Sequence, residues 1–215
     1  MKGRCDSAAI SLYLRVPYTV FVCVLVPVYW VAYGPANFLW GSNIALFVTL
    51  VAIWTENRLL ASMMALGVLL PETAWMVDFA VRLVLGQEAL PLVGTRYMFS
   101  ADIPLWVRSL SLYHIALPII LVWLLHRLGY QQRALLWQTL VAWLVLPLSY
   151  LVGEPSASIN WVHGFGHEPQ TAMPGPLFVA LLMVLFPAAL YLPTHLLLSR
   201  LFSDPHECVA RDGPE

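Results

Sequence analysis

The stretch VPYTVFVCVLVPVYWVAYGPANFLWGSNIALFVTLVAIW, residues 16–54, contains no Asp, Glu, Lys or Arg. It divides into two apolar runs, Val16–Tyr33 and Asn37–Trp54, because Gly34 and Pro35 break the chain between them. Each run approaches the roughly 20 apolar residues that a helix needs to cross the hydrocarbon core of a bilayer. Neither run alternates like a barrel strand, and backbone groups in hydrocarbon must be satisfied within their own segment. The stretch therefore predicts two successive transmembrane helices, the first of them an uncleaved span.

Composition extends this prediction to the whole chain. Of 215 residues, 60% are hydrophobic and 11% are charged, whereas a soluble domain carries about 25% charged residues. The net charge of −1 provides no basic surface for nucleic acid, and the three cysteines form no paired motif. We predict an all-α polytopic membrane helical bundle of about six transmembrane helices in residues 1–202, followed by a disordered cytoplasmic tail in residues 203–215.

The other predicted spans follow from the same criterion. Pro71 interrupts the third span and should kink it, because proline removes a backbone donor. A short amphipathic or re-entrant segment is expected around Ile103–Val107. The further spans are predicted at Leu59–Leu85, Ser109–Leu128, Ala134–Val152 and Pro176–Leu198.

The positive charges orient the bundle, because the cytoplasmic loops of membrane proteins are enriched in Lys and Arg. With a cytoplasmic N-terminus, three of the 11 basic residues fall outside, namely Arg82, Arg96 and Arg108. Eight fall inside, namely Lys2, Arg4, Arg15, Arg58, Arg127, Arg133, Arg200 and Arg211. We therefore expect both termini in the cytoplasm and the protein in a cell membrane, with a bacterial inner membrane as the expected setting.

This orientation gathers the polar side chains of the spans in the outer half of the bundle. An ionisable group within a span is costly and is therefore a candidate functional residue. Glu72 follows the predicted kink at Pro71, where it either serves a function or supports the broken turn. Asp78 and Arg82 have the helical spacing of a local ion pair at the water boundary, which is the favoured interpretation for them.

His114 is the strongest candidate for chemistry. Pro118 lies four residues later and removes the donor that would bond the carbonyl of His114, so the helix is loosened there. Histidine is also the best general base near neutral pH. A histidine that is hydrogen-bonded to a neighbouring helix is the alternative interpretation.

The loop INWVHGFGHEPQ, residues 159–170, concentrates polar residues between the last two spans: Asn160, His163, His167 and Glu168. The spacing of His163 and His167 would place two metal ligands on one helix face, but the glycines between them and Pro169 make a poor helix. A metal site, a polar lid over an outward-facing pocket and a solvated connection all remain open. No metal ligand or cofactor is assigned.

Short segments carry a family resemblance. NFLWGSNIALF in the second span and HIALPIILVW in the fourth resemble the marker segments of the androgen-induced-protein and androgen-dependent-regulator group, and NWVHG is a third, shorter likeness. That group comprises multipass membrane hydrolases of lipid esters that pair a threonine with a histidine. The transmembrane-protein-164-like acyltransferases use cysteine and histidine in a similar plan. The resemblance implies that His114 is catalytic, but Trp40 stands where the threonine is expected, and Ser42 and Asn43 are the nearest polar residues.

The first functional hypothesis is an intramembrane lipid-directed hydrolase or acyltransferase with an outward-facing polar site. It assigns His114 as the general base and Ser42 as the nucleophile, with Asn43 or Asn160 as the oxyanion donor. Asp78 or Glu72 is expected to orient the histidine. The residues expected to line the substrate site are Asn160, His163, Glu72 and Asp78. We expect His114 and Asn43 to share one cavity, capped by the loop that carries Asn160 and His163, and we expect membrane lipids as the partners.

Two other classes of protein remain open. A small transporter is favoured by the break beside Glu72, because broken helices at polar residues are typical of transporters. No internal repeat supports it, however. A non-catalytic subunit or assembly factor, with other membrane proteins as partners, is favoured by the small size of the chain.

Overall fold

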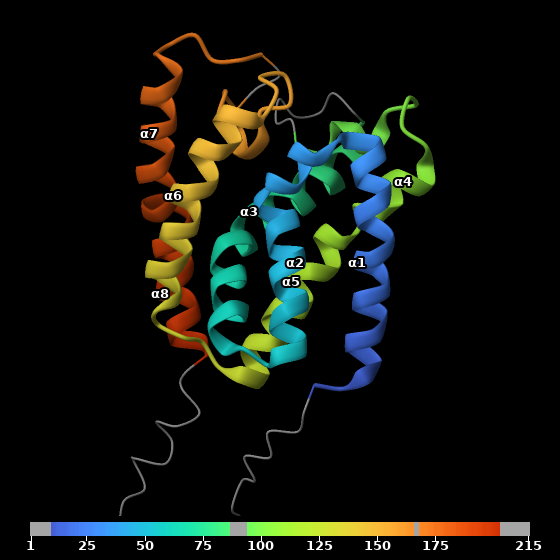
Figure 1. The fold of residues 1–215 in the computed structure, drawn as a ribbon, viewed down its shortest axis with the longest axis vertical. Helices are drawn as coiled ribbons and strands as arrows, with labels where there is room; N and C mark the ends of the chain where they lie inside the picture. The colour runs from blue at the N-terminus through green and yellow to red at the C-terminus, as the bar shows by residue number, and fades with distance from the viewer. Residues whose placement is uncertain (1–9, 87–93, 166–167, 203–215) are drawn as a thin grey trace, which may run out of the picture.

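The computed structural model describes residues 10–86, 94–165 and 168–202, and these form a helical bundle without a strand (Figure 1). The long elements are α1 (Leu12–Tyr33), α2 (Gly41–Thr55), α3 (Arg58–Leu85), α5 (Tyr113–Leu128), α6 (Ala134–Val152), α7 (Gly175–Leu185) and α8 (Leu192–Leu201). The short elements are η1 (Pro35–Leu39), η2 (Arg96–Phe99), α4 (Leu105–Leu110), η3 (Ile159–Trp161) and the π-helical η4 (Phe186–Tyr191). The predicted all-α fold is confirmed. The predicted tail, residues 203–215, lies outside the described residues.

Five helical segments are long and apolar enough to cross a membrane, as expected of a membrane protein. They are α1, α3, α4 with α5, α6, and the continuous stretch of α7, η4 and α8. The remaining predicted span, Asn37–Trp54, corresponds to η1 and the shorter apolar helix α2. At about 2.0 Å per residue for η1 and 1.5 Å for α2, their combined length is about 32 Å. That length matches a hydrocarbon core of about 30 Å.

Local signals set several helix ends. The side chain of Asn57 accepts a hydrogen bond from the backbone N–H of Leu60 and so caps the start of α3. Gly34 ends α1 with a φ of 76°, a conformation that glycine adopts without strain. The predicted break between the first two spans therefore lies at the Gly34–Pro35 pair. The start of α1 and the end of α8 lie at the same end of the bundle (Figure 1).

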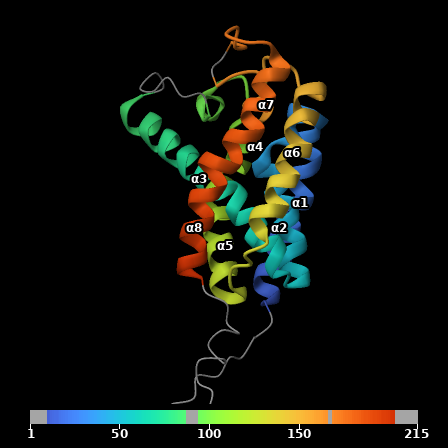
Figure 2. The same cartoon turned by 90° about the vertical axis from the view of Figure 1, so that its left-hand side faces the viewer.

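Helix α3 is the centre of the bundle and packs against α2, α5 and α6. Its first half is buried from Ala61 to Leu66, where small residues allow neighbouring helices to approach. Pro71 lies in the middle of the helix, and Figure 2 shows the C-terminal half leaning away from the rest of the bundle. The helix is therefore bent, as proline inside a helix predicts, rather than broken.

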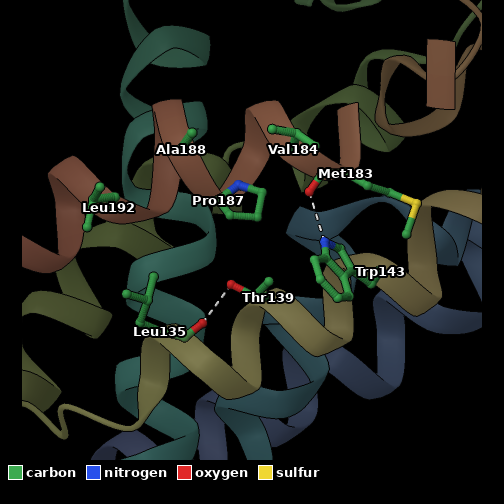
Figure 3. A pocket seen from close by; sticks show the side chains of 8 residues that line it. All are labelled: Leu135, Thr139, Trp143, Met183, Val184, Pro187, Ala188 and Leu192. Atoms are coloured by element: carbon green, nitrogen blue, oxygen red, sulfur yellow. Dashed lines mark hydrogen bonds between the residues drawn. The ribbon is translucent and has the colours of Figure 1, made fainter. Parts of the chain in front are cut away.

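The last predicted span contains a feature that the sequence analysis did not predict. Pro187 has no backbone N–H, so the carbonyl of Met183 has no donor four residues later. The indole Nε1 of Trp143, from α6, donates to that carbonyl over 2.8 Å instead (Figure 3). The helix continues past the proline as the π-helical segment η4. Between α6 and η4 lies an apolar groove of about 380 Å³, whose lining includes Leu135, Thr139, Val184 and Leu192.

Candidate functional site

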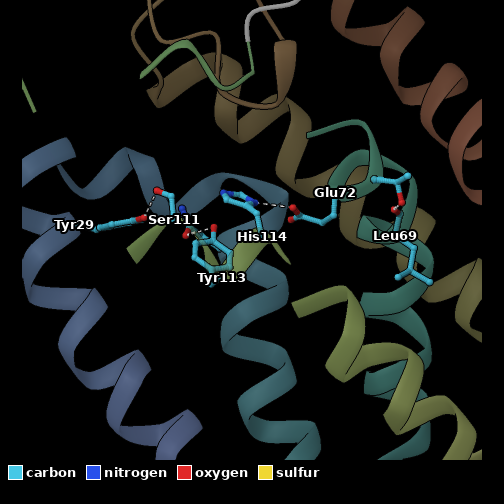
Figure 4. A network of polar contacts seen from close by, with 8 residues as sticks. Tyr29, Leu69, Glu72, Ser111, Tyr113 and His114 are labelled. Atoms are coloured by element: carbon cyan, nitrogen blue, oxygen red, sulfur yellow. Dashed lines mark hydrogen bonds and ion pairs between the residues drawn. The ribbon is translucent and has the colours of Figure 1, made fainter. Parts of the chain in front are cut away.

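The bend of α3 places Glu72 against the first turn of α5. The Oε2 atom of Glu72 lies 2.6 Å from Nδ1 of His114 (Figure 4). Glu72 is only 2% exposed, so its carboxylate is buried inside the protein. A carboxylate in hydrocarbon requires such a partner. Of the two carboxylates that the sequence offered as partners of the histidine, the structure pairs Glu72 with it.

Two aromatic rings hold the imidazole of His114 between them. The Trp75 ring stacks on one side at a centroid distance of 4.6 Å, and the Tyr113 ring stacks at 4.2 Å. These contacts and the Glu72 bond fix the plane of the imidazole ring. Its other nitrogen, Nε2, makes no hydrogen bond within the described part of the chain, and 12% of the side chain remains exposed. The pair therefore has the geometry of a proton acceptor with one oriented, unoccupied nitrogen.

Asn43 supports this stack. Its Nδ2 donates to the carbonyl of Asn37 over 2.8 Å, and its Oδ1 accepts from the Tyr113 hydroxyl over 3.0 Å. Asn43 is therefore brought into the neighbourhood of His114, as predicted. One N–H of its amide is bonded to Asn37 and its oxygen accepts from Tyr113, so Asn43 positions Tyr113, and its role as an oxyanion donor stays a prediction.

Ser42, the predicted nucleophile, lies beside the Tyr113 phenol. Among the described residues no hydrogen bond joins it to His114. The predicted nucleophile and base are thus close in the fold but are not paired.

Asn160 is a structural clamp. Its Oδ1 accepts from the backbone N–H of Gly41 over 2.9 Å, and its Nδ2 donates to the carbonyl of Leu39 over 2.7 Å and to Ser149 Oγ over 2.9 Å. These bonds tie the loop before α7 to the junction of η1 and α2 and to α6. The amide is fully engaged, so the predicted oxyanion role of Asn160 has no free donor.

His163 does not join the site of His114. Its ring stacks on Tyr150 at 4.9 Å, and its Nε2 is buried without a hydrogen bond among the described residues. Hydrogen bonds and ring stacking therefore link His114 to Glu72 and, through Tyr113, to Asn43, but not to His163. The shared cavity itself stays a prediction. His167 lies outside the described residues. Within the described ranges no group of three or more His, Cys, Asp or Glu side chains is close enough to hold a metal ion.

Asp78 forms the predicted ion pair with Arg82, Oδ1 to Nε, at 3.0 Å. Both residues are buried inside the protein, at 2% and 3% exposure. The other carboxylate oxygen accepts from the N–H of Thr95 over 2.9 Å and from its hydroxyl over 2.7 Å. Asp78 therefore anchors the segment that leads to η2 and does not touch His114.

Sequence reasoning missed the aromatic residues of the site. Trp75 lies three residues after Glu72, a spacing that places both side chains on one face of a helix. Tyr113 precedes His114 directly, and no periodicity indicates that adjacent rings will stack. The helical spacing between Glu72 and Trp75 was therefore the one feature of the sequence that could have indicated an aromatic residue in the site.

The fold and the site together define a class, a polytopic helical membrane protein with a buried carboxylate–imidazole pair. Comparison with protein families, with curated proteins and with solved structures finds no match for the chain. The resemblance to lipid-ester hydrolases and acyltransferases therefore stays a prediction.

Proposed function

We propose that this protein is an intramembrane lipid-directed hydrolase or acyltransferase in which the Glu72–His114 pair acts as the general base. The observation that carries the proposal is the 2.6 Å contact from Glu72 Oε2 to His114 Nδ1, which leaves Nε2 unoccupied. Lipid esters are the proposed substrates, because the pair lies between membrane-spanning segments that meet hydrocarbon rather than water.

In this mechanism Nε2 of His114 removes a proton from water, or from an acceptor hydroxyl, as its oxygen attacks the ester carbonyl. The positive charge that develops on the imidazole is stabilised by the Glu72 carboxylate, which interacts more strongly in a low-dielectric site than it would in water. The imidazolium then returns the proton to the leaving alkoxide. Trp75 and Tyr113 hold the ring plane, so the proton acceptor needs little reorganisation.

The test is turnover of a fluorescent diacyl lipid ester by purified protein in detergent and in liposomes. We expect His114→Gln to reduce turnover about 10²- to 10⁴-fold, the usual range for a lost general base. Glu72→Gln should also reduce it, because the developing imidazolium loses its counter-charge. His163→Gln, a matched change at a histidine outside the site, should leave turnover unchanged. Wild-type turnover by His114→Gln would exclude the mechanism.

Ser42 distinguishes two routes. If water or an acceptor alcohol attacks directly, Ser42→Ala retains turnover. If Ser42 forms an acyl intermediate, Ser42→Ala loses turnover, and the intermediate is detected as an acylated protein by mass spectrometry.

A small proton-coupled transporter is the second candidate. Pro71 adjoins Glu72 in the bent α3, and an ionisable pair within a span is typical of proton relays. Proton uptake into liposomes that is lost in Glu72→Gln, without ester turnover, would favour the transporter. A protein with neither activity fits the non-catalytic subunit.

We also infer that both termini are cytoplasmic and that the end of the bundle nearest His114 faces outward. The support is the distribution of basic residues, eight against three, together with the shared end of the described termini (Figure 1).

A further inference from the structure

We propose that Arg108 and Tyr33 form a binding subsite for a phosphate or carboxylate oxyanion beside the Glu72–His114 pair. Where the oxyanion belongs to a lipid headgroup, the subsite would hold the polar end of the substrate. The assignment of the anion to the headgroup of a lipid substrate rests on the proposed function, whereas the binding of an anion does not.

Arg108 is a half-buried cation without a carboxylate partner among the described residues. Its Nη1 donates to the carbonyl of Met98 over 2.6 Å, and its Nε is buried without a hydrogen bond. Arg15 and Arg82, in contrast, have carboxylate partners, Glu56 and Asp78, although Nε of Arg15 is likewise buried without a hydrogen bond in the described chain. An uncompensated guanidinium with a buried, unpaired donor is costly unless an anion completes it.

Tyr33, the last residue of α1, supplies a second unpaired polar atom, and α1 packs against α4, which carries Arg108. Its hydroxyl is buried, makes no hydrogen bond within the described residues and lies in the electrostatic field of Arg108. The Tyr29 ring packs edge-on against Tyr33 at 5.0 Å, and the Tyr29 hydroxyl bonds Ser111 Oγ over 2.7 Å. The backbone N–H of Ser111 in turn donates to the carbonyl of Arg108 over 2.9 Å. These contacts bring the end of α1, which carries Tyr33, together with α4, which carries Arg108.

The subsite adjoins the proposed catalytic pair. The backbone N–H of His114 donates to the carbonyl of Ser111 over 3.1 Å, so one turn of chain separates Ser111 from the imidazole. The Tyr97 phenol, from η2, lies near Ser111. Burial raises the pKa of Tyr97 well above its ordinary value, so the phenol remains a neutral donor. Near the imidazole, Nε1 of Trp75 is a further buried donor without a partner in the described chain.

The chemistry of these donors selects the ligand. Guanidinium, phenol and indole N–H groups donate, and a guanidinium matches the oxygens of a phosphate or carboxylate in a bidentate manner. Arg108 lies in α4, at the end of the bundle opposite the described termini (Figure 1). Lipid headgroups occupy the zone just outside the hydrocarbon core. The arrangement therefore fits an anionic headgroup whose acyl chains extend along the bundle.

The experiment measures binding to the purified full-length protein in neutral detergent, from the thermal unfolding midpoint at increasing ligand concentration. Three probes are used: inorganic phosphate, an ether-linked phosphatidylglycerol that contains no hydrolysable ester, and an ether-linked dialkylglycerol that lacks the phosphate. Each is tested on wild-type protein, on Arg108→Gln, Arg108→Lys and Tyr33→Phe, and on Arg133→Gln. Arg133 is an exposed arginine at the start of α6, far along the chain from the subsite, and provides the matched loss of charge.

We expect phosphatidylglycerol to bind and dialkylglycerol to bind much more weakly. Arg108→Gln should weaken the binding of phosphatidylglycerol at least about tenfold, which is the loss expected for a charged hydrogen bond. Tyr33→Phe and Arg108→Lys should weaken this binding less than Arg108→Gln does. These two variants test the subsite if Arg108→Gln does not fold. Arg133→Gln should bind like wild type. Saturable binding of inorganic phosphate that depends on Arg108 identifies a small-anion site, and dependence on Arg108 for the lipid alone identifies a headgroup site.

Equal affinity of Arg108→Gln and Arg133→Gln for phosphatidylglycerol would overturn the proposal, as would equal affinity of wild-type protein for phosphatidylglycerol and dialkylglycerol. Failure of the proposed function has a different signature. If the protein binds phosphatidylglycerol through Arg108 but hydrolyses no ester, the subsite is supported and the hydrolase activity is excluded. If the protein hydrolyses esters but binds the anion equally well without Arg108, only the subsite is excluded.

Discussion

At the residue scale, the site depends on a relay of contacts rather than on one side chain. Asn37 holds Asn43, Asn43 accepts from the hydroxyl of Tyr113, and the ring of Tyr113 stacks on His114. Glu72 fixes the same imidazole from α3. Asn43 is 2% exposed, so each of its polar atoms needs a partner inside the bundle. The relay therefore couples the geometry of α2 to the imidazole of α5.

Tyr113→Phe should destabilise the protein while it preserves the ring stack. The substitution removes the donor of the Asn43 Oδ1 atom and leaves a buried acceptor unpaired, which costs about 1–3 kcal/mol. Denaturant unfolding in mild detergent measures the change. Tyr13→Phe is the matched control, because Tyr13 is 93% exposed, and it should have no effect. Equal stability of the two variants would contradict the relay.

At the element scale, prolines decide the shapes of the helices, and side chains from neighbouring helices compensate for the donors that they lack. Pro71 bends α3 and directs Glu72 toward α5. Pro187 leaves the carbonyl of Met183 without its helical donor, and Trp143 of α6 supplies one. In hydrocarbon no water can take that role. The hydrogen bond of Trp143 is therefore part of the reason that the last segment continues as one helical stretch.

Trp143→Phe should lower the stability of the bundle by about 1 kcal/mol, because it leaves the Met183 carbonyl unpaired. Trp137→Phe, on the same helix and equally exposed at 47%, is the matched control. The double variant Trp143→Phe, Pro187→Ala restores a backbone donor at position 187 and should recover most of the loss. Unfolding midpoints of the four proteins test this, and a double variant no more stable than Trp143→Phe would refute the explanation.

At the scale of the whole molecule, the bundle alternates in direction from one span to the next. The described termini consequently lie at one end, with the loops before η1 and α7 at the other (Figure 1). The Arg108 subsite lies toward this second end (Figure 1), whereas Glu72 of the proposed site lies in the middle of α3. We propose that this second end faces the outside of the cell, and lipid could reach the site from the outer leaflet only in that orientation.

Single cysteines test this orientation in a background that lacks Cys5, Cys23 and Cys208. Ser156→Cys lies in the loop between α6 and α7, and Gln132→Cys lies in the turn between α5 and α6. Both positions are exposed. We expect a membrane-impermeant maleimide to label Ser156→Cys in intact cells and Gln132→Cys only after permeabilisation. The opposite pattern would invert the bundle and place the site on the cytoplasmic side.

The sequence alone determined the class of fold and most helix boundaries. A bilayer obliges each backbone segment to satisfy its own hydrogen bonds, so apolar length and helix-ending residues are sufficient signals. The predicted fifth span, Ala134–Val152, has the observed bounds of α6. The boundary between α4 and α5 and the π-helix around Pro187 were not predicted, because they depend on contacts with other helices.

Only the tertiary structure decided which polar groups meet. The spans are apolar on nearly every face, so the sequence does not reveal how each helix is rotated about its axis. His114 could be selected from its own surroundings, but its pairing with Glu72 rather than Asp78 depends on the bend of α3 and its packing on α5. The same packing commits the amides of Asn43 and Asn160 to backbone carbonyls. These contacts depend on how the helices pack against one another, and residue spacing within a single helix does not predict that packing.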